Sequence, residues 1–155
     1  MEDHPGSHDL VREGDVAATD QELFDELTLD TLARGDAAFI HQNCVDAFAA
    51  QHADMETKPI KVVFAVMGLY LHLEKGFTGR QVQRAHVRMA RQRRVWPQIP
   101  VPAARAEITV ADVMGTARGA ERDAMIERWC AAVWEAWQGE RGAIVSLARS
   151  ELGVQ

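Results

Sequence analysis

The chain has 155 residues, 47% of them hydrophobic, which is enough to bury the core of one domain and requires no second one. Its net charge of −6 is uneven, because residues 1–36 carry eleven acids against Arg12 and Arg34, whereas residues 37–155 carry twelve acids and fifteen bases. The chain starts without the basic and apolar blocks of a signal peptide, and no apolar run reaches the roughly 20 residues that span a bilayer. With only two cysteines, both in predicted core helices, we expect a cytoplasmic protein with free thiols and no membrane contact.

The first elements follow an acidic leader. Residues 1–18 are polar, contain Pro5 and two glycines, and show no apolar period, so we predict a disordered leader before a helical-bundle domain over 19–155. The alternative is that this acidic leader lies across the basic fourth helix described below. Thr19 and Glu22 have the spacing of a capping box, which predicts that a helix begins near residue 20 and ends before Gly35. A second helix is predicted over about 37–53.

The third helix, about 58–75, is apolar on every side, and a helix without a polar face is surrounded by other elements. A fourth helix is predicted over 79–94, and three prolines make 96–102 a Pro-rich strap that cannot be helical. A capping box at Thr109 and Asp112 predicts a short helix, followed by one over 120–138 and a last helix after Gly142. The sequence therefore predicts an all-α, single-domain helical bundle around a buried central helix.

Several polar side chains interrupt these apolar patterns. His41 and Gln51 share one face of the second helix with Cys44, Glu74 ends the apolar third helix, and His86 interrupts the apolar stripe of the fourth. Burying such a group costs about 1–3 kcal/mol unless it finds a partner, so together they indicate a site or a shared polar network. The competing interpretation is that both histidines are neutral core residues bonded to carbonyls or to Gln51.

Two hypotheses for function follow. The first is a small-molecule enzyme, with a metal-dependent form, in which His41 and His86 act as metal ligands or as acid and base. Glu74 would then be the carboxylate partner and third ligand of a divalent transition metal, with His72 at the end of the same helix as the alternative ligand, and Tyr70 would orient the substrate. The alternative is a non-catalytic ligand-binding or protein-interaction module. The chain has none of the common short motifs of metalloproteases, nucleotide-binding proteins or serine hydrolases.

The fourth helix carries a dense row of arginines on the side away from its apolar stripe. A basic row can grip phosphates, but the chain is acidic overall and no aromatic residues are interleaved for base stacking. We therefore expect no nucleic-acid partner, and a solvated face that pairs with acids such as Glu22, Asp25 and Glu26. A small-molecule ligand and self-association are the other expected partners. The arginines are Arg80, Arg84, Arg88, Arg91, Arg93 and Arg94.

Four sequence blocks occur in a characteristic order: FIHQxxVDAxxxQ from Phe39, KPIxxxFAxxGLY from Lys58, FTGxQVQxxH from Phe77 and WCxxVWxxW from Trp129. Over roughly residues 20–150 the chain resembles a family of small bacterial helical proteins classified as a domain of unknown function. The resemblance implies a bacterial protein with an all-α fold and brings no activity. It places the following polar residues inside the family pattern: His41, Gln42, Asp46, Gln51, Lys58, Tyr70, Glu74, Gln83 and His86.

Overall fold

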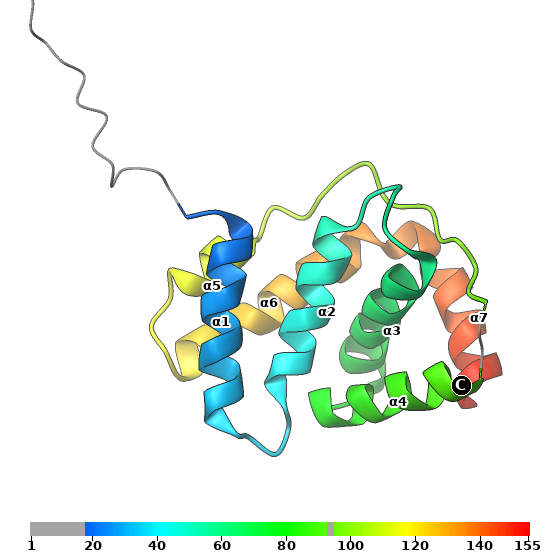
Figure 1. The fold of residues 1–155 in the computed structure, drawn as a ribbon, viewed down its shortest axis with the longest axis horizontal. Helices are drawn as coiled ribbons and strands as arrows, with labels where there is room; N and C mark the ends of the chain where they lie inside the picture. The colour runs from blue at the N-terminus through cyan, green and yellow to red at the C-terminus, as the bar shows by residue number, and fades with distance from the viewer. Residues whose placement is uncertain (1–17, 93–94) are drawn as a thin grey trace, which may run out of the picture.

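The structure, a computed structural model, describes residues 18–92 and 95–155, and over these residues it is all-α with no strand. Residues 1–17 of the predicted leader lie outside the described residues, and so do residues 93–94. No helix in these ranges is both long and apolar enough to cross a membrane. The described helices, shown in Figure 1, are α1 (Asp20–Arg34), α2 (Ile40–His52), α3 (Pro59–Lys75), α4 (Gly79–Gln92), α5 (Val110–Met114), α6 (Ala120–Ala136) and α7 (Arg141–Leu152), with a 3₁₀ turn η1 (Gln138–Glu140).

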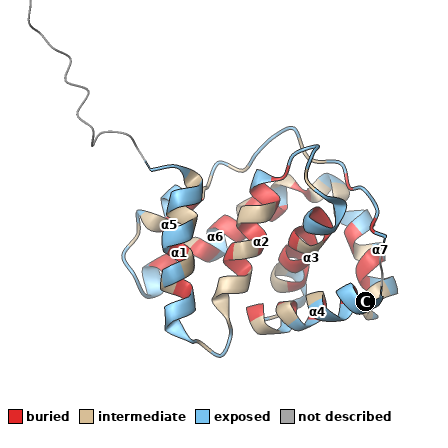
Figure 2. Cartoon of the chain, viewed as in Figure 1, coloured by how far each residue is buried: buried red, intermediate tan, exposed pale blue. Residues whose placement is uncertain are grey.

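Helix α3 is the buried centre of the bundle, as its uniform apolar pattern predicts. It packs against α2, α4, α6 and α7, and nine of its residues are buried. Figure 2 shows buried residues along α3, whereas the outer faces of α1 and α4 are exposed. Pro59 occupies the first turn, where its missing N–H costs nothing, and Gly76 ends the helix at φ 70°. The prediction of an all-α bundle around a central helix is confirmed.

Helix α2 begins at Ile40, three residues later than predicted. Phe39 has a φ of 54°, in the left-handed region that ends or interrupts a helix, and Asp36 Oδ2 accepts from the Ile40 N–H at 3.0 Å. The same turn contacts the start of α4, because the Arg80 guanidinium lies 4.3 Å from the centroid of the Phe39 ring. A Cβ on Gly79 would lie 1.9 Å from the Phe39 carbonyl oxygen, so glycine permits this close approach.

The other helix ends follow the local signals. Thr19 Oγ1 accepts from the Glu22 N–H, and Thr109 and Asp112 form both bonds of a capping box at α5. Helix α6 ends at Ala136 and not at 138, because the chain tightens there into η1. The Pro-rich strap has no regular secondary structure, as expected, and Trp96 and Ile99 anchor it to the core.

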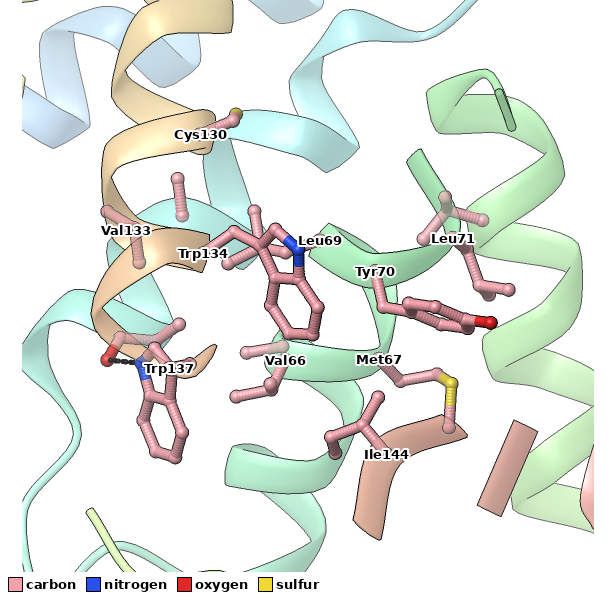
Figure 3. Packing of buried hydrophobic residues seen from close by; sticks show 14 of the residues in the cluster. Val66, Met67, Leu69, Tyr70, Leu71, Cys130, Val133, Trp134, Trp137 and Ile144 are labelled. Atoms are coloured by element: carbon pink, nitrogen blue, oxygen red, sulfur yellow. Dashed lines mark hydrogen bonds between the residues drawn. The ribbon is translucent and has the colours of Figure 1, made fainter. Parts of the chain in front are cut away.

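Gln51 joins α2, α6 and the segment between the strap and α5. Its side-chain oxygen accepts from the Trp129 indole N–H at 2.8 Å, and its side-chain nitrogen donates to the carbonyls of Ile108 at 2.7 Å and Ala106 at 3.3 Å. A second indole ties the same helix to α6, since Trp137 donates to a carbonyl of α2 at 3.2 Å (Figure 3). Gln51 therefore satisfies polar groups from two other segments.

We expect Gln51→Leu to lower the free energy of unfolding by about 3 kcal/mol. The change removes the partner of the buried Trp129 indole N–H, a loss of about 1–3 kcal/mol, and the bonds to two part-buried carbonyls, which add smaller losses. Urea denaturation measures the loss, with the exposed Gln21→Leu as the matched control. Equal stabilities of the two variants would contradict the assigned role of Gln51.

Candidate functional site

His41 joins α1 to α2. Its Nδ1 lies 3.0 Å from the hydroxyl of Thr31, a buried residue of α1, and its ring stacks on the Phe39 ring at 5.5 Å between centroids. Burial lowers the pKa of His41, because desolvation disfavours the charged ring. His41 is therefore placed at the α1–α2 contact as a hydrogen-bonded residue.

His86 is bonded through both ring nitrogens. Nε2 lies 2.8 Å from the carbonyl of Phe64 in α3, and Nδ1 lies 3.5 Å from the side-chain nitrogen of Gln42 in α2. A carbonyl can only accept, so Nε2 carries the proton, and Nδ1 accepts from Gln42 in a neutral ring. Burial lowers the pKa of His86 to about 4, which keeps the ring neutral at pH 7.

Asp46 extends this network into the core. Gln42 donates from its side-chain nitrogen to Asp46 Oδ1 at 3.1 Å, whereas the buried Oδ2 has no hydrogen-bond partner among the described residues. Burial raises the pKa of Asp46 well above its ordinary value, so the neutral acid is the favoured form. Gly68 makes room for the carboxyl group, since a Cβ there would lie 1.9 Å from Oδ2. We call Gln42, Asp46 and His86 the polar network.

The sequence-based search selected His86 but did not select Asp46 or Gln42 as site residues. The signals were present: Gln42 and Asp46 are four residues apart on one helix, and a glycine interrupts the otherwise bulky α3. Neither signal identifies the residue that contacts Asp46, because Gly68 and Asp46 meet only when α2 packs against α3.

Glu74 is held by two residues of the last helices. Its carboxylate accepts from Arg141 Nη2 at 2.6 Å and from the Trp134 indole N–H at 2.9 Å, and Arg141 lowers the pKa of Glu74. Tyr70, one turn earlier on α3, is 1% exposed and lies against Trp134 in the packed cluster of Figure 3. Tyr70 is therefore part of the packed core between α3 and α6.

The three predicted metal ligands contact different partners. His41 bonds to α1, His86 to α2 and α3, and Glu74 to α6 and α7. Over residues 18–92 and 95–155, no group of three or more histidine, cysteine, aspartate or glutamate side chains is arranged to hold a metal ion. The structure therefore does not gather these ligands into one centre, although metal binding and the catalytic roles of His41, His86, Glu74 and Tyr70 stay predictions.

His72, the alternative to Glu74 as a ligand from the end of the third helix, forms a separate titratable contact. Its Nδ1 lies 2.6 Å from the carbonyl of Phe77, in the turn before α4, and its Nε2 lies 2.6 Å from a carboxylate oxygen of Glu127 in α6. Two acceptors favour the doubly protonated ring, and the bond to Glu127 is the main reason that the pKa of His72 is raised.

We expect this contact to stabilise the protein at mildly acidic pH. Because the folded pKa is raised, the contribution is fully present below the unfolded value of 6.5 and is lost as pH rises through the folded pKa. Glu127 is half exposed, so the effect should not exceed about 1 kcal/mol. Unfolding of the wild type and Glu127→Gln should differ more at about pH 6 than at about pH 8.5. A difference that grows with pH would contradict the assignment.

The outer face of α4 is a row of exposed arginines. Arg84, Arg88 and Arg91 are exposed and take part in no hydrogen bond or ion pair among the described residues, and Val87, between them, is 47% exposed. The expected pairs with acids of α1 do not occur within the described part of the chain. We call Arg84, Val87, Arg88 and Arg91 the arginine face.

Two hollows border the arginine face. One of about 510 Å³ lies along α4 itself, and a second of about 220 Å³ lies between α4 and the end of the chain. The first is lined by Gln83, Arg84, Val87, Arg88, Arg91 and Gln92, and the second by Phe77, Gln81, Arg84, Ala85, Arg88, Leu152 and Val154. Basic side chains and small apolar surfaces therefore lie next to each other.

Comparison with known proteins places the chain in a family. The model of DUF5946, a family of unknown function, matches residues 12–138. The chain belongs to this family. No curated protein and no solved structure matches it. The match spans most of the range of the resemblance noted in the sequence, and it includes the polar network and the arginine face.

Proposed function

We propose that this member of DUF5946 is a non-catalytic protein-interaction module, and that its arginine face binds an acidic, amphipathic helical segment of a partner protein. The observation that carries the proposal is the row of Arg84, Arg88 and Arg91, which are exposed around Val87 and have no ion-pair partner among the described residues. Elsewhere in the described residues, Arg34, Arg122 and Arg141 each pair with a carboxylate.

The arginine row has an energetic cost in the free protein. Arg84 and Arg88 are four residues apart on one helix, and Arg91 follows three residues later. Like charges at such spacing destabilise a helix by roughly 0.2–0.5 kcal/mol per pair. An acidic partner would remove this repulsion and add charge-assisted hydrogen bonds, for which the planar guanidinium is well suited.

The apolar surface of the same face favours a protein partner over nucleic acid. Val87 and the hollow lined by Phe77, Leu152 and Val154 offer contacts for aliphatic side chains, which phosphates and sugars do not supply. An amphipathic helix with acids beside leucine-type residues matches both the arginines and this apolar surface.

The hydrogen bonds of His86 and Glu74 favour a protein-interaction module over the enzyme hypothesis. His86 is bonded at both nitrogens and Glu74 is held by Arg141, so neither is presented as a free acid or base. The enzyme hypothesis is not tested by these contacts. Small-molecule binding, a bacterial origin and a cytoplasmic location likewise stay predictions from the sequence.

Fluorescence anisotropy with a labelled acidic amphipathic peptide tests the proposal. The peptide carries glutamates and leucines on one helical face, and we expect it to bind the wild type with an affinity that falls as salt rises. The double variant Arg84→Glu, Arg88→Glu should lose about tenfold or more, because each exposed charge contact contributes up to about 1 kcal/mol and reversal adds repulsion.

The matched control changes two exposed arginines on other helices, Arg128→Glu with Arg149→Glu, and so alters the net charge equally. This control should retain most of the affinity. Equal losses in both double variants would show that only the overall charge matters and would overturn the proposal. A labelled DNA duplex that binds more tightly than the peptide, and depends on Arg84 and Arg88, would replace the protein partner with nucleic acid.

A further inference from the structure

The outer face of α1 carries acidic and apolar side chains, which are the two kinds that a partner of the arginine face is proposed to supply. Glu22, Asp25 and Glu26 are exposed in its first two turns, and none of them forms an ion pair with a described lysine or arginine. Leu29 and Leu32 follow on the same side and are 72% and 52% exposed. The outer face of α1 is therefore itself an acidic, amphipathic surface on which Leu29 and Leu32 face solvent.

We propose that the segment bound by the arginine face is α1 of a second copy of this chain, so that copies associate head to tail. The inference rests on the proposed function and names its partner. It accounts for two unpartnered surfaces at once, since the acids and leucines of α1 would cover the arginines and Val87 of α4.

The spacing of the two faces agrees. On α1, Asp25 and Glu26 lie four and three residues before Leu29. On α4, Arg84 lies three residues before Val87, and Arg91 lies four residues after it. At about 1.5 Å of rise per residue, offsets of three and four residues are about 4.5 and 6 Å along the helix axis. When Leu29 lies against Val87, acids and arginines therefore come within about one helical turn of each other in either helix direction.

The remaining interactions of the acids are local and leave them free to bind a partner. Asp25 accepts from Gln21 one turn earlier at 2.9 Å, and Glu22 takes part in the cap at Thr19. Both are exposed contacts within or beside α1, which cost little to exchange for an arginine. Burying the exposed leucines adds a favourable hydrophobic contribution that their present positions lack.

The two surfaces lie on different parts of the molecule. In Figure 1, α1 is on the left side of the molecule beside α5, and α4 runs along the lower right, with α2 between α1 and α4. A single contact from α1 of one copy to α4 of the next leaves one free face of each kind on the pair. Association then closes as a reciprocal dimer or a larger ring, or it continues into an open chain.

Sedimentation velocity of the full-length protein tests the inference. The wild type should form species larger than a monomer at about 0.05 M salt, and they should dissociate at about 0.5 M salt, where exposed charge pairs are screened. Asp25→Lys with Glu26→Lys should be monomeric at low salt, and so should Arg84→Glu with Arg88→Glu. The matched control, Glu107→Lys with Glu135→Lys, changes two exposed acids elsewhere and should associate like the wild type. Circular dichroism checks that each variant remains folded.

Mixing the two charge-reversed variants gives the decisive result. Their altered faces are again of opposite charge, so the mixture should regain association that neither variant shows alone. A wild type that stays monomeric, or a mixture that stays monomeric, overturns the inference. If a monomeric wild type still binds the acidic peptide through Arg84 and Arg88, the proposed function stands with another partner. If peptide binding is also absent, both fail.

Discussion

Replacing Gly68 with alanine is expected to lower the free energy of unfolding by about 3 kcal/mol. A Cβ at this position would lie 1.9 Å from Asp46 Oδ2, 2.5 Å from its Cγ and 3.1 Å from Val82 Cγ1, so the packing of α2 and α4 on α3 must shift. Overpacking of a well-filled core costs about 1–3 kcal/mol, and here the obstacle is a buried carboxyl group of limited freedom. Urea denaturation of the variant measures the loss.

A second substitution separates this steric effect from helix propensity. Asp46→Ala removes the carboxyl group that the new methyl would meet, so adding it to Gly68→Ala should recover part of the stability. The expected coupling between the two changes is about 1–3 kcal/mol in a double-mutant cycle. Additive losses would show that Asp46 and Gly68 do not share this space. Gly35→Ala is unsuitable as a control because its φ is 56°, whereas the exposed Gly142→Ala serves well.

Acidification is expected to remove about 3 kcal/mol of stability through His86. Its pKa is lowered from 6.5 to about 4 by burial, so as pH falls the unfolded chain takes up the proton first. The contribution is therefore fully present above about pH 6.5 and is lost as pH falls toward 4. Protonation would also turn Nδ1 into a donor facing the amide nitrogen of Gln42, which removes the present bond.

His86→Gln isolates this effect, because glutamine keeps a donor but does not titrate. Near pH 7 the variant should have a lower free energy of unfolding than the wild type. Between pH 7 and about pH 4, the difference should shift in favour of the variant by about 3 kcal/mol. Asp46 acts in the opposite direction, since its raised pKa favours the folded state at low pH. Comparing the two proteins at each pH removes most of this shared contribution. A difference in unfolding free energy that is constant from pH 7 to 4 would contradict the assignment.

The polar network and the arginine face lie on opposite sides of α4. His86, with the buried Val82 and Met89, faces the core, while Arg84 and Arg88 face solvent. The buried bonds to Gln42 and to the Phe64 carbonyl fix α4 against α2 and α3, and this fixes the direction in which the arginines project. Substitutions in the polar network should therefore weaken peptide binding only when they change how α4 packs against α2 and α3.

Local features of the sequence determined the fold class and most helix boundaries. The caps at Thr19 and Thr109 form within three residues, and the apolar period of a helix repeats within one or two turns, so neither depends on distant contacts. The uniform apolar character of α3 likewise predicts its central place, because a helix without a polar face is covered on every side.

Only the tertiary structure decided what the polar side chains do. The sequence showed that His41, His86 and Glu74 interrupt apolar patterns, but their partners come from other helices, as Glu74 with Arg141, 67 residues away, illustrates. The same holds for Phe39, whose left-handed backbone accompanies the approach of Gly79, and for Asp46, whose pKa rises because α3 covers it. Which groups meet depends on how the helices pack, and burial, charge state and hydrogen bonding follow from that packing.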